Sequence, residues 1–202
     1  IEGLPLDTTE DRLKALGAAA ASSGSVALFH AVGITPEAPT LEAAIGGGRA
    51  SRTVEITPER LRAARDELST TSREDLAAVS LGTPHFSLAE FEALIPLLHG
   101  IRVDPHVDLF ISTGRDVLSE VERRGWLSHV RGAGARIVTD TCTYITPIMR
   151  VKDGPFMTNS AKAAWYAPMN VGADVVFGSL EECVRSAVSG RVWRDERLWA
   201  DG

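Results

Sequence analysis

Apolar residues occur in short runs along this chain, and most runs are followed by an amphipathic stretch. The runs are apolar at consecutive positions, as in SVALFHA at residues 25–31, and do not alternate with polar residues. Such strands are typical of a parallel sheet buried on both faces and alternating with helices. The sequence therefore predicts an α/β fold, with a mostly parallel sheet and helices on both faces. The expected strands are residues 25–31, 52–56, 76–81, 108–112, 136–139 and 173–177, and the main expected helices are 8–23, 58–68, 87–99, 115–124, 159–166 and 180–188.

The chain length of 202 residues suits one domain, or one domain with a small appendage. We expect a leading α/β segment to about residue 70, a main α/β core over residues 71–190 and a tail over residues 191–202. Acidic residues interrupt the basic cluster of this tail, which is typical of a solvated segment. A long loop is expected from residue 140 through Gly154.

Composition narrows the class of protein. The net charge of -6 and the pI of about 5.4 argue against a nucleic-acid partner, which selects for a basic face. No apolar run approaches the ~20 residues of a membrane helix, and the first residues do not resemble a signal peptide. The two cysteines are far apart in sequence and do not form a disulfide framework, so we expect a reducing cytoplasm. The lack of an initiator Met suggests a start after processing or inside a longer reading frame.

Polar sequence gathers at the junctions where predicted strands lead into helices. These junctions are residues 82–87, 112–115, 140–143 and 178–179. Ligands of parallel sheets bind at the carboxyl ends of the strands, which lie along one edge. The sequence therefore predicts one composite site at that edge.

Three side chains with metal or proton chemistry stand out. Cys142 directly follows a predicted strand and is a candidate metal ligand, although a free cysteine is often a buried, inert core residue. Cys183 lies inside a predicted helix, where the core interpretation is stronger. His85 can act as a general acid or base or donate to a carboxylate, or it can simply cap its own loop. Two cysteines cannot complete an iron–sulfur site, so another ligand would have to come from elsewhere.

Other polar residues are suited to binding a carboxylate. Asn159, Ser160 and Lys162 open a predicted helix, whose N-terminal amide groups attract anions. A plain helix cap with an exposed lysine is the alternative. Ser112 and Arg115 lie at another junction, and the arginine offers a bidentate grip on a carboxylate.

Sequence phrases along most of the chain resemble the large, catalytic subunit of the aconitase X family. These phrases are ASSGSVALFHAVGITPEAPT, LGTPHFSLAEFEAL, DTCTYITPI, MTNSAKAAWYAP and GSLEECVRSAVSGRV. The resemblance implies an aconitase-like α/β domain and a hydro-lyase reaction assisted by iron, as an iron–sulfur cluster (2Fe–2S preferred) or as mononuclear iron. It also implies that the chain is the later half of a catalytic region. An N-terminal catalytic segment and a small swivelling subunit or domain would then complete the enzyme.

The resemblance also assigns residues. Cys142 matches the cysteine of the family's DTC motif and is the first candidate iron ligand, and Cys183 lies in a shared motif as a second candidate. Thr83 occupies a position of the Gly-x-Pro-His motif where relatives often carry cysteine, which points to substrate binding by its hydroxyl. The NSAK-like segment, with Asn159, Ser160 and Lys162, is implied to bind substrate.

Several functions follow as alternatives. The resemblance implies dehydration of a small hydroxy acid, either cis-3-hydroxy-L-proline or mevalonate 5-phosphate. Thr83 and the lack of an added basic cluster for a phosphate favour hydroxyproline. A non-catalytic assembly fragment and a metal-free α/β binding module are the alternatives from other classes.

Overall fold

The computed structural model describes residues 1–145, 148–149 and 153–199, and the chain divides into two compact units, Ile1–Thr57 and Pro58–Gly202. The first unit contains two helices, α1 (Glu10–Gly24) and α2 (Leu41–Ile45). Threonine caps each helix: Thr9 accepts from Arg12 N–H, and Thr40 accepts from Ala43 N–H. Each cap satisfies a backbone N–H of the first turn of its helix, and α1 matches the predicted helix at residues 8–23 to within a residue or two.

The strands expected at residues 25–31 and 52–56 are not formed. Residues 1–57 contain no strand, and Leu28, which a buried strand would cover, is 74% exposed. Ser25 adopts a left-handed conformation that ends α1. A single extended segment leaves its backbone groups unpaired, and residues 1–57 supply no second strand to pair with it. The leading segment is therefore helical here and not α/β.

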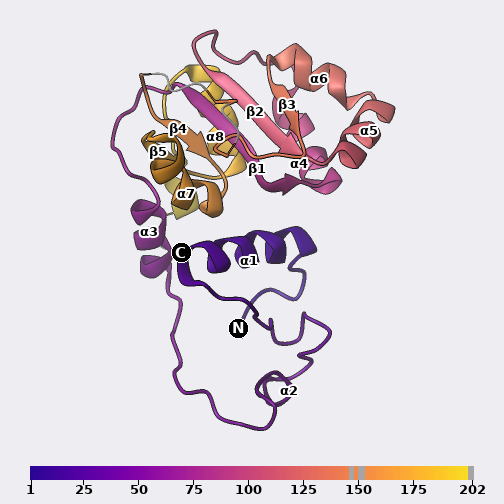
Figure 1. Cartoon of the computed structure of the whole chain (residues 1–202), viewed down its shortest axis with the longest axis vertical. Coiled ribbons are helices and arrows are strands. Elements are labelled where there is room, and N and C mark those ends of the chain that lie inside the picture. The colour runs from indigo at the N-terminus through magenta and orange to yellow at the C-terminus, as the bar shows by residue number, and fades with distance from the viewer. Residues whose placement is uncertain (146–147, 150–152, 200–202) are drawn as a thin grey trace. The chain divides into compact units, whose positions relative to one another are not determined.

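The second unit is built on a five-stranded parallel sheet. Its strands are β1 (Ala78–Phe86), β2 (Asp108–Thr113), β3 (Arg136–Thr139), β4 (Phe156–Thr158) and β5 (Val175–Phe177). They run in the order β3-β2-β1-β4-β5, and every pair is parallel, with β1 central (Figure 1). The predicted α/β fold with a parallel sheet is confirmed.

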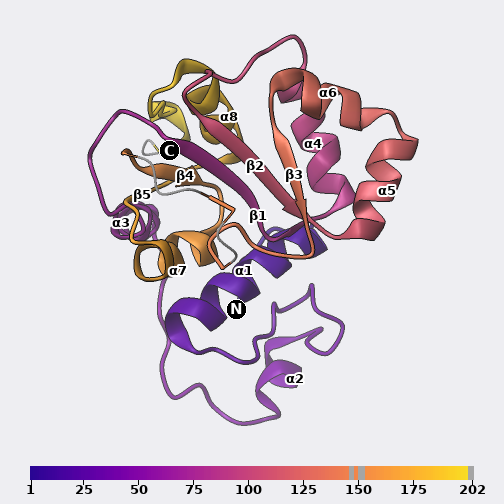
Figure 2. The same ribbon diagram turned by 45° about the horizontal axis from the view of Figure 1, so that its top comes forward.

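Helices cover both faces of this sheet, and side chains alternate between the faces along each strand. One core contains Val79, Leu109 and Met157 and packs against α4 (Leu88–Leu98), α5 (Arg115–Arg123), α6 (Trp126–Ala133) and α8 (Leu180–Ser189). The other core contains Ala78, Phe110 and Phe156 and packs against α7 (Ala161–Val171). A helix α3 (Pro58–Glu67) precedes the sheet, and Leu68 after it contacts this second core. Figure 2 shows α7 apart from the group α4, α5 and α6.

Two elements were not predicted from the sequence, the helix α6 and the strand β4. The strand is only three residues long, directly after Pro155, and gives too short an apolar run to recognise. Its position matters because it pairs with β1 and so brings Asn159 and Ser160 to the same edge of the sheet as the other junctions. The long loop predicted before Gly154 includes residues 146–147 and 150–152, which lie outside the described residues.

The C-terminal tail is partly packed onto the second unit, which differs from the solvated segment that its charges predict. The backbone of Arg191 forms an isolated antiparallel β-bridge with Asp75, and Val192 packs against the first core described above. Trp193 N–H donates to Ser186 Oγ over 2.8 Å. A short 3-10 helix (Glu196–Trp199) follows. Within the described ranges, no helix is long and apolar enough to cross a bilayer.

Candidate functional site

The candidate site lies where the parallel strands β1 to β4 end. The sequence Ser112-Thr113 closes β2, Asp140 follows β3, and Asn159 follows β4. Thr83 lies in the last part of β1, within the stretch between Leu81 and Phe86 where the register with β2 shifts. All four strands run in one direction, so their polar ends share one edge, as the junction sequences predict.

Ser160 joins the end of β1 to the beginning of α7. Its hydroxyl donates to the Thr83 carbonyl oxygen and accepts from Ala163 N–H over 3.0 Å, which makes it the N-cap of α7. Its own N–H donates to Thr158 Oγ1 over 3.2 Å. The helix start that carries Asn159 and Lys162, both half-buried, is therefore held at the edge of the sheet.

The segment after β3 is anchored over the central strand. Thr143 Oγ1 and Ser80 Oγ are 2.6 Å apart, and both hydroxyls are buried. This contact places the neighbouring Cys142 and Tyr144 on the α7 side of the sheet, where Tyr144 belongs to the core and Cys142 packs against it. The Tyr144 ring stacks on Tyr166 of α7, with 6.3 Å between the ring centroids. Cys142 itself is half-buried, in contrast to the fully buried Cys183.

Three buried hydroxyl oxygens in the described part of the chain lack a hydrogen-bond partner: Thr83 Oγ1, Ser112 Oγ and Tyr144 Oη. All three belong to the strand ends and the loop just described. An unsatisfied buried polar group costs about 1–3 kcal/mol, so native proteins seldom retain several together without a reason. Burial and the neighbouring Cys142 thiol raise the pKa of Tyr144 to about 12. These unpartnered hydroxyls make this edge of the sheet the candidate binding site.

Arg115 and Asp140 form an ion pair across the ends of β2 and β3. Arg115 Nε donates to Asp140 Oδ2 over 2.6 Å, and Arg115 N–H donates to Asp140 Oδ1 over 3.2 Å. The pKa of Asp140 is lowered, chiefly by the hydrogen bond from Arg115 and to a smaller extent by the charge of nearby His85. The guanidinium group predicted to hold a substrate carboxylate is thus already paired with a carboxylate of the chain. His85 lies inside β1, close to this pair.

The structure does not bring Cys183 to this site. It lies in α8, it is 0% exposed, and it packs in the core on the opposite face of the sheet from Cys142. Burial raises the pKa of its thiol well above the usual range. A protonated thiol inside an apolar core is inert. The core interpretation of Cys183 fits this position, and the two cysteines cannot share one metal centre.

The donors at the strand ends fit a partial metal site. Within residues 1–145, 148–149 and 153–199, no group of three or more His, Cys, Asp and Glu side chains could hold a metal ion. Cys142 is the one cysteine at this edge, and the orphaned hydroxyls of Thr83 and Ser112 at the same edge suit the oxygen atoms of a small polar substrate. These residues are compatible with one thiolate ligand to iron and with substrate contacts, while further ligands would come from outside them.

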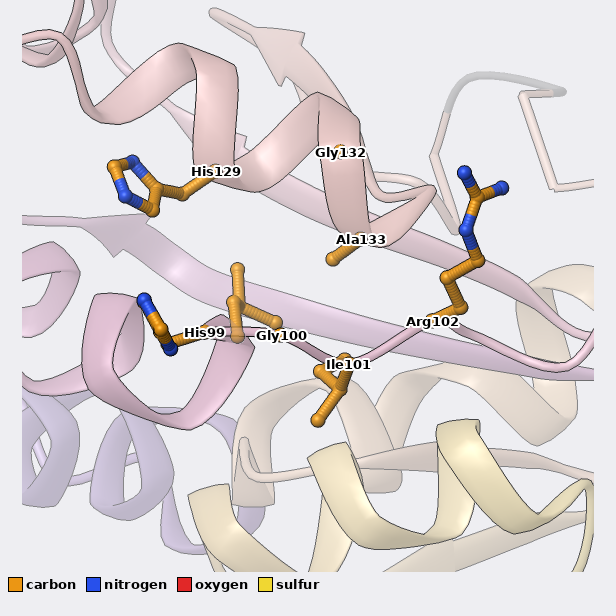
Figure 3. A pocket seen from close by; sticks show the side chains of 8 residues that line it. His99, Gly100, Ile101, Arg102, His129, Gly132 and Ala133 are labelled. Atoms are coloured by element: carbon orange, nitrogen blue, oxygen red, sulfur yellow. The ribbon is translucent and has the colours of Figure 1, made fainter.

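A separate hollow of about 380 Å³ lies between the end of α4 and α6 (Figure 3). His99 and His129 line it, with 6.3 Å between their ring centroids, together with Arg102. These residues come shortly before β2 and β3, so the hollow lies toward the side where strands begin. None of the site residues predicted from the sequence lines it.

Sequence reasoning missed Tyr144 and the pairing role of Asp140. Tyr144 follows Cys142 by two residues, and an aromatic residue directly after the short polar run that follows β3 was a signal that a side chain is buried there. Asp140 has a positive φ of 58°, a conformation that no periodic pattern reveals.

Comparison with known families decides the relationship. A family model described as the Aconitase X third domain matches residues 76–189, and one described as the Aconitase X second domain matches residues 1–66. The chain belongs to the aconitase X family. This confirms the resemblance that the sequence phrases indicate, and the core that carries the candidate site corresponds to the third domain of aconitase X.

Aconitase X relatives are considerably longer than this chain. It is 46% identical over 183 residues to cis-3-hydroxy-L-proline dehydratase of Pseudomonas aeruginosa, covering 90% of this chain and 32% of that protein. It is 36% identical to the phosphomevalonate dehydratase large subunit of Methanothermobacter thermautotrophicus, covering 91% of this chain and 46% of that subunit. The crystal structure of Thermococcus kodakaraensis aconitase X in its holo-form matches with a TM-score of 0.75 at 26% identity, over 92% of this chain and 46% of that one. The chain thus spans a third to a half of the length of these relatives.

Proposed function

We propose that this chain forms part of an iron-dependent hydro-lyase that removes water from a small hydroxy carboxylic acid, with cis-3-hydroxy-L-proline as its substrate. The observation that carries the proposal is the set of orphaned hydroxyls at the same carboxyl edge of an aconitase X domain as a half-buried cysteine. A dehydratase of this kind needs a Lewis acid for the leaving hydroxyl and polar groups that orient the acid. The carboxyl edge of the sheet offers a candidate ligand for the Lewis acid and candidate polar groups for the substrate.

Cys142 is the proposed iron ligand of this chain, toward a 2Fe–2S cluster or a mononuclear iron. Iron supplies Lewis acidity toward the leaving hydroxyl group when it is bound. Cys183 is not included, because it lies on the other face of the sheet. The remaining ligands are proposed to come from an N-terminal catalytic segment, in line with relatives that are two to three times as long as the matched region.

The substrate carboxylate is proposed to bind at the start of α7. Asn159 and Lys162 lie there beside the N-terminal amide groups of the helix, an arrangement that attracts anions. The Ser160 hydroxyl already donates to Thr83 and caps the helix, so its part is to hold these groups in place. Thr83 and Ser112 contribute buried hydroxyls that lack partners among the described residues and could meet polar atoms of the substrate.

His85 is proposed as a proton-transfer group or as a donor to the substrate. The nearby Asp140 forms an ion pair with Arg115, so the charged groups closest to the histidine in this part of the site are already paired with each other. A catalytic base on a small swivelling subunit or domain would complete the site. Several relatives are named large subunits, which supports a partner of this kind.

Two observations favour hydroxyproline over mevalonate 5-phosphate. The dehydratase of Pseudomonas aeruginosa that shares 46% identity is named for cis-3-hydroxy-L-proline, whereas the phosphomevalonate dehydratase large subunit from Methanothermobacter shares 36%. A phosphate would also call for additional cationic side chains, and Arg115 at this edge is committed to Asp140.

The test uses the complete enzyme, with this chain, its N-terminal segment and the small subunit, loaded anaerobically with iron. We expect dehydration of cis-3-hydroxy-L-proline, and we expect Cys142→Ala to lose both bound iron and activity. Cys183→Ala is the matched control and should retain iron, since its sulfur lies in the opposite core. Full activity and unchanged iron in Cys142→Ala would refute the ligand assignment. An assembly that binds no iron and dehydrates neither candidate substrate would instead support an assembly fragment.

A further inference from the structure

The Tyr144 hydroxyl is one of the three buried oxygens left without a partner, and it lies beside the Cys142 thiol. Tyr144 is only 3% exposed. A buried phenol normally finds an acceptor, because its hydroxyl group loses water on folding and gains nothing in return otherwise. An unsatisfied tyrosine hydroxyl next to a candidate metal ligand therefore needs an explanation.

The position of the phenol ring is set by packing on several sides. The ring belongs to the core on the α7 side of the sheet and stacks on Tyr166. The adjacent Thr143 is tied to Ser80 of the central strand, and Ile145 N–H donates to the Cys142 carbonyl oxygen over 3.2 Å. These contacts fix the loop on both sides of Tyr144, so packing holds the phenol ring in the same core cluster as Cys142.

We propose that Tyr144 is a positioning residue, whose hydroxyl donates a hydrogen bond to the Cys142 sulfur when that sulfur binds iron. A neutral thiol is a weak acceptor, while a metal-bound thiolate carries negative charge and is a better one. The inference rests on the proposed iron-binding role of Cys142. It adds to that role a reason for the buried tyrosine, whose hydroxyl would be satisfied only in the loaded enzyme.

Hydrogen bonds to ligand sulfur atoms stabilise the bound thiolate and raise the reduction potential of an iron centre. Loss of the Tyr144 hydroxyl should therefore weaken iron retention and make the potential more negative. Loss of a hydroxyl that faces elsewhere should change neither property. The chain has two tyrosines, and they stack on each other, which provides a matched comparison.

The experiment compares Tyr144→Phe with Tyr166→Phe in the complete iron-loaded enzyme. Both variants keep the ring and remove one oxygen atom. We expect Tyr144→Phe to lose iron to a chelator roughly tenfold faster and to have a more negative reduction potential and an altered visible spectrum. Tyr166→Phe should match the unaltered enzyme in all three measurements. Thermal unfolding of both variants shows whether the fold is retained.

The outcomes separate the two proposals. If Cys142→Ala keeps its iron, the ligand assignment fails and the role of Tyr144 fails with it. If Cys142→Ala loses iron while Tyr144→Phe has unchanged iron release, potential and spectrum, the inference about Tyr144 alone is overturned. Equal changes in Tyr144→Phe and Tyr166→Phe would also overturn it, because they would point to general loosening of the stacked rings.

Discussion

The hydroxyl of Ser160 donates to the backbone carbonyl of Thr83 and connects two elements that are 77 residues apart in sequence. The same oxygen accepts from Ala163 N–H at the start of α7. One side chain thereby sets where the helix with Asn159 and Lys162 begins relative to the end of β1. The carboxylate-binding part of the proposed site depends on this connection.

Replacement of Ser160 by alanine should destabilise the protein and impair the site together. The variant loses a helix cap and a buried inter-element hydrogen bond, for an expected cost of about 1–3 kcal/mol. Chemical denaturation measures this loss, and KM for the hydroxy acid should rise in the complete enzyme. Ser119→Ala is the control, because the exposed Ser119 hydroxyl bonds only within α5, and its effect should stay within about 0.5 kcal/mol. A Ser160→Ala protein as stable as the control would contradict the connecting role.

Gly82 should not tolerate a side chain. Its φ is +85°, and a Cβ atom there would overlap the carbonyl oxygen of Ser112 on the neighbouring strand. We expect Gly82→Ala to cost at least about 2 kcal/mol, from backbone strain and the displaced strand end. Gly132→Ala should change the stability in the opposite direction, since Gly132 lies in α6 with nothing within 4 Å of an added Cβ. That change should stabilise the protein by about 0.5–1 kcal/mol. Similar effects of both substitutions would refute the close approach.

The parallel sheet could be predicted from the sequence because its central strands are buried on both faces. Consecutive apolar residues in β1, β2 and β3, with helices between them, leave few alternatives to a parallel α/β core. The capping box of Ser87 and Glu90 likewise marks the start of α4, and both of its hydrogen bonds are formed. Local sequence patterns were enough to predict these strands and this helix start, because the apolar run of each strand and the hydrogen bonds of the capping box involve residues close in sequence.

Non-local pairing explains what the sequence did not reveal. The run at residues 25–31 is as apolar as a strand, but a strand forms only where a partner strand is present. The three residues of β4 form a strand because β1 and β5 flank them, and no local pattern carries that information. For the candidate site, the sequence predicted that Cys142 and the helix start at Ser160 lie at the carboxyl edge of the sheet, which is where the structure has them. It could not show that Arg115 is already paired or that Cys183 faces the other core.

The ion pair between Asp140 and Arg115 should make a pH-dependent contribution to stability. The pKa of the Asp140 carboxyl group in the folded protein is below the usual value of 3.8, because Arg115 donates hydrogen bonds to this group. A lowered carboxyl pKa stabilises the folded state above the unfolded pKa, and this contribution is lost as pH falls through the folded pKa. Stability should therefore decline below about pH 4 less steeply in Asp140→Asn than in the unaltered protein. Asparagine suits the φ of 58° at this position, so the backbone should be retained. Parallel curves for the two proteins would contradict the pairing.

Glu182 is a fully buried carboxylate whose two oxygens are both used. Oε2 accepts from Ser179 N–H over 2.7 Å, and Oε1 accepts from Asp195 N–H over 3.0 Å, which ties the C-terminal segment to α8. Glutamine has only one acceptor oxygen, so Glu182→Gln should cost about 1–3 kcal/mol in denaturation experiments.

Glu181→Gln is the matched control, because Glu181 is its exposed neighbour and forms a surface ion pair with Arg185. Its effect should lie within about 0.5 kcal/mol. Equal losses for the two substitutions would show that the buried acceptors of Glu182 contribute little.

The two cysteines should differ sharply in their reactivity toward thiol reagents. Cys142 is half-buried at the sheet edge, whereas Cys183 is fully buried in α8 and has a raised thiol pKa because of that burial. Since the thiolate is the reacting form, a reagent must both reach the sulfur and find it deprotonated. In the folded, iron-free protein we expect Cys142 to be alkylated first and Cys183 to react only after denaturant is added, as measured by peptide mass spectrometry. Alkylation of Cys183 at the rate of Cys142 under native conditions would place both sulfurs in accessible positions and reopen Cys183 as a ligand.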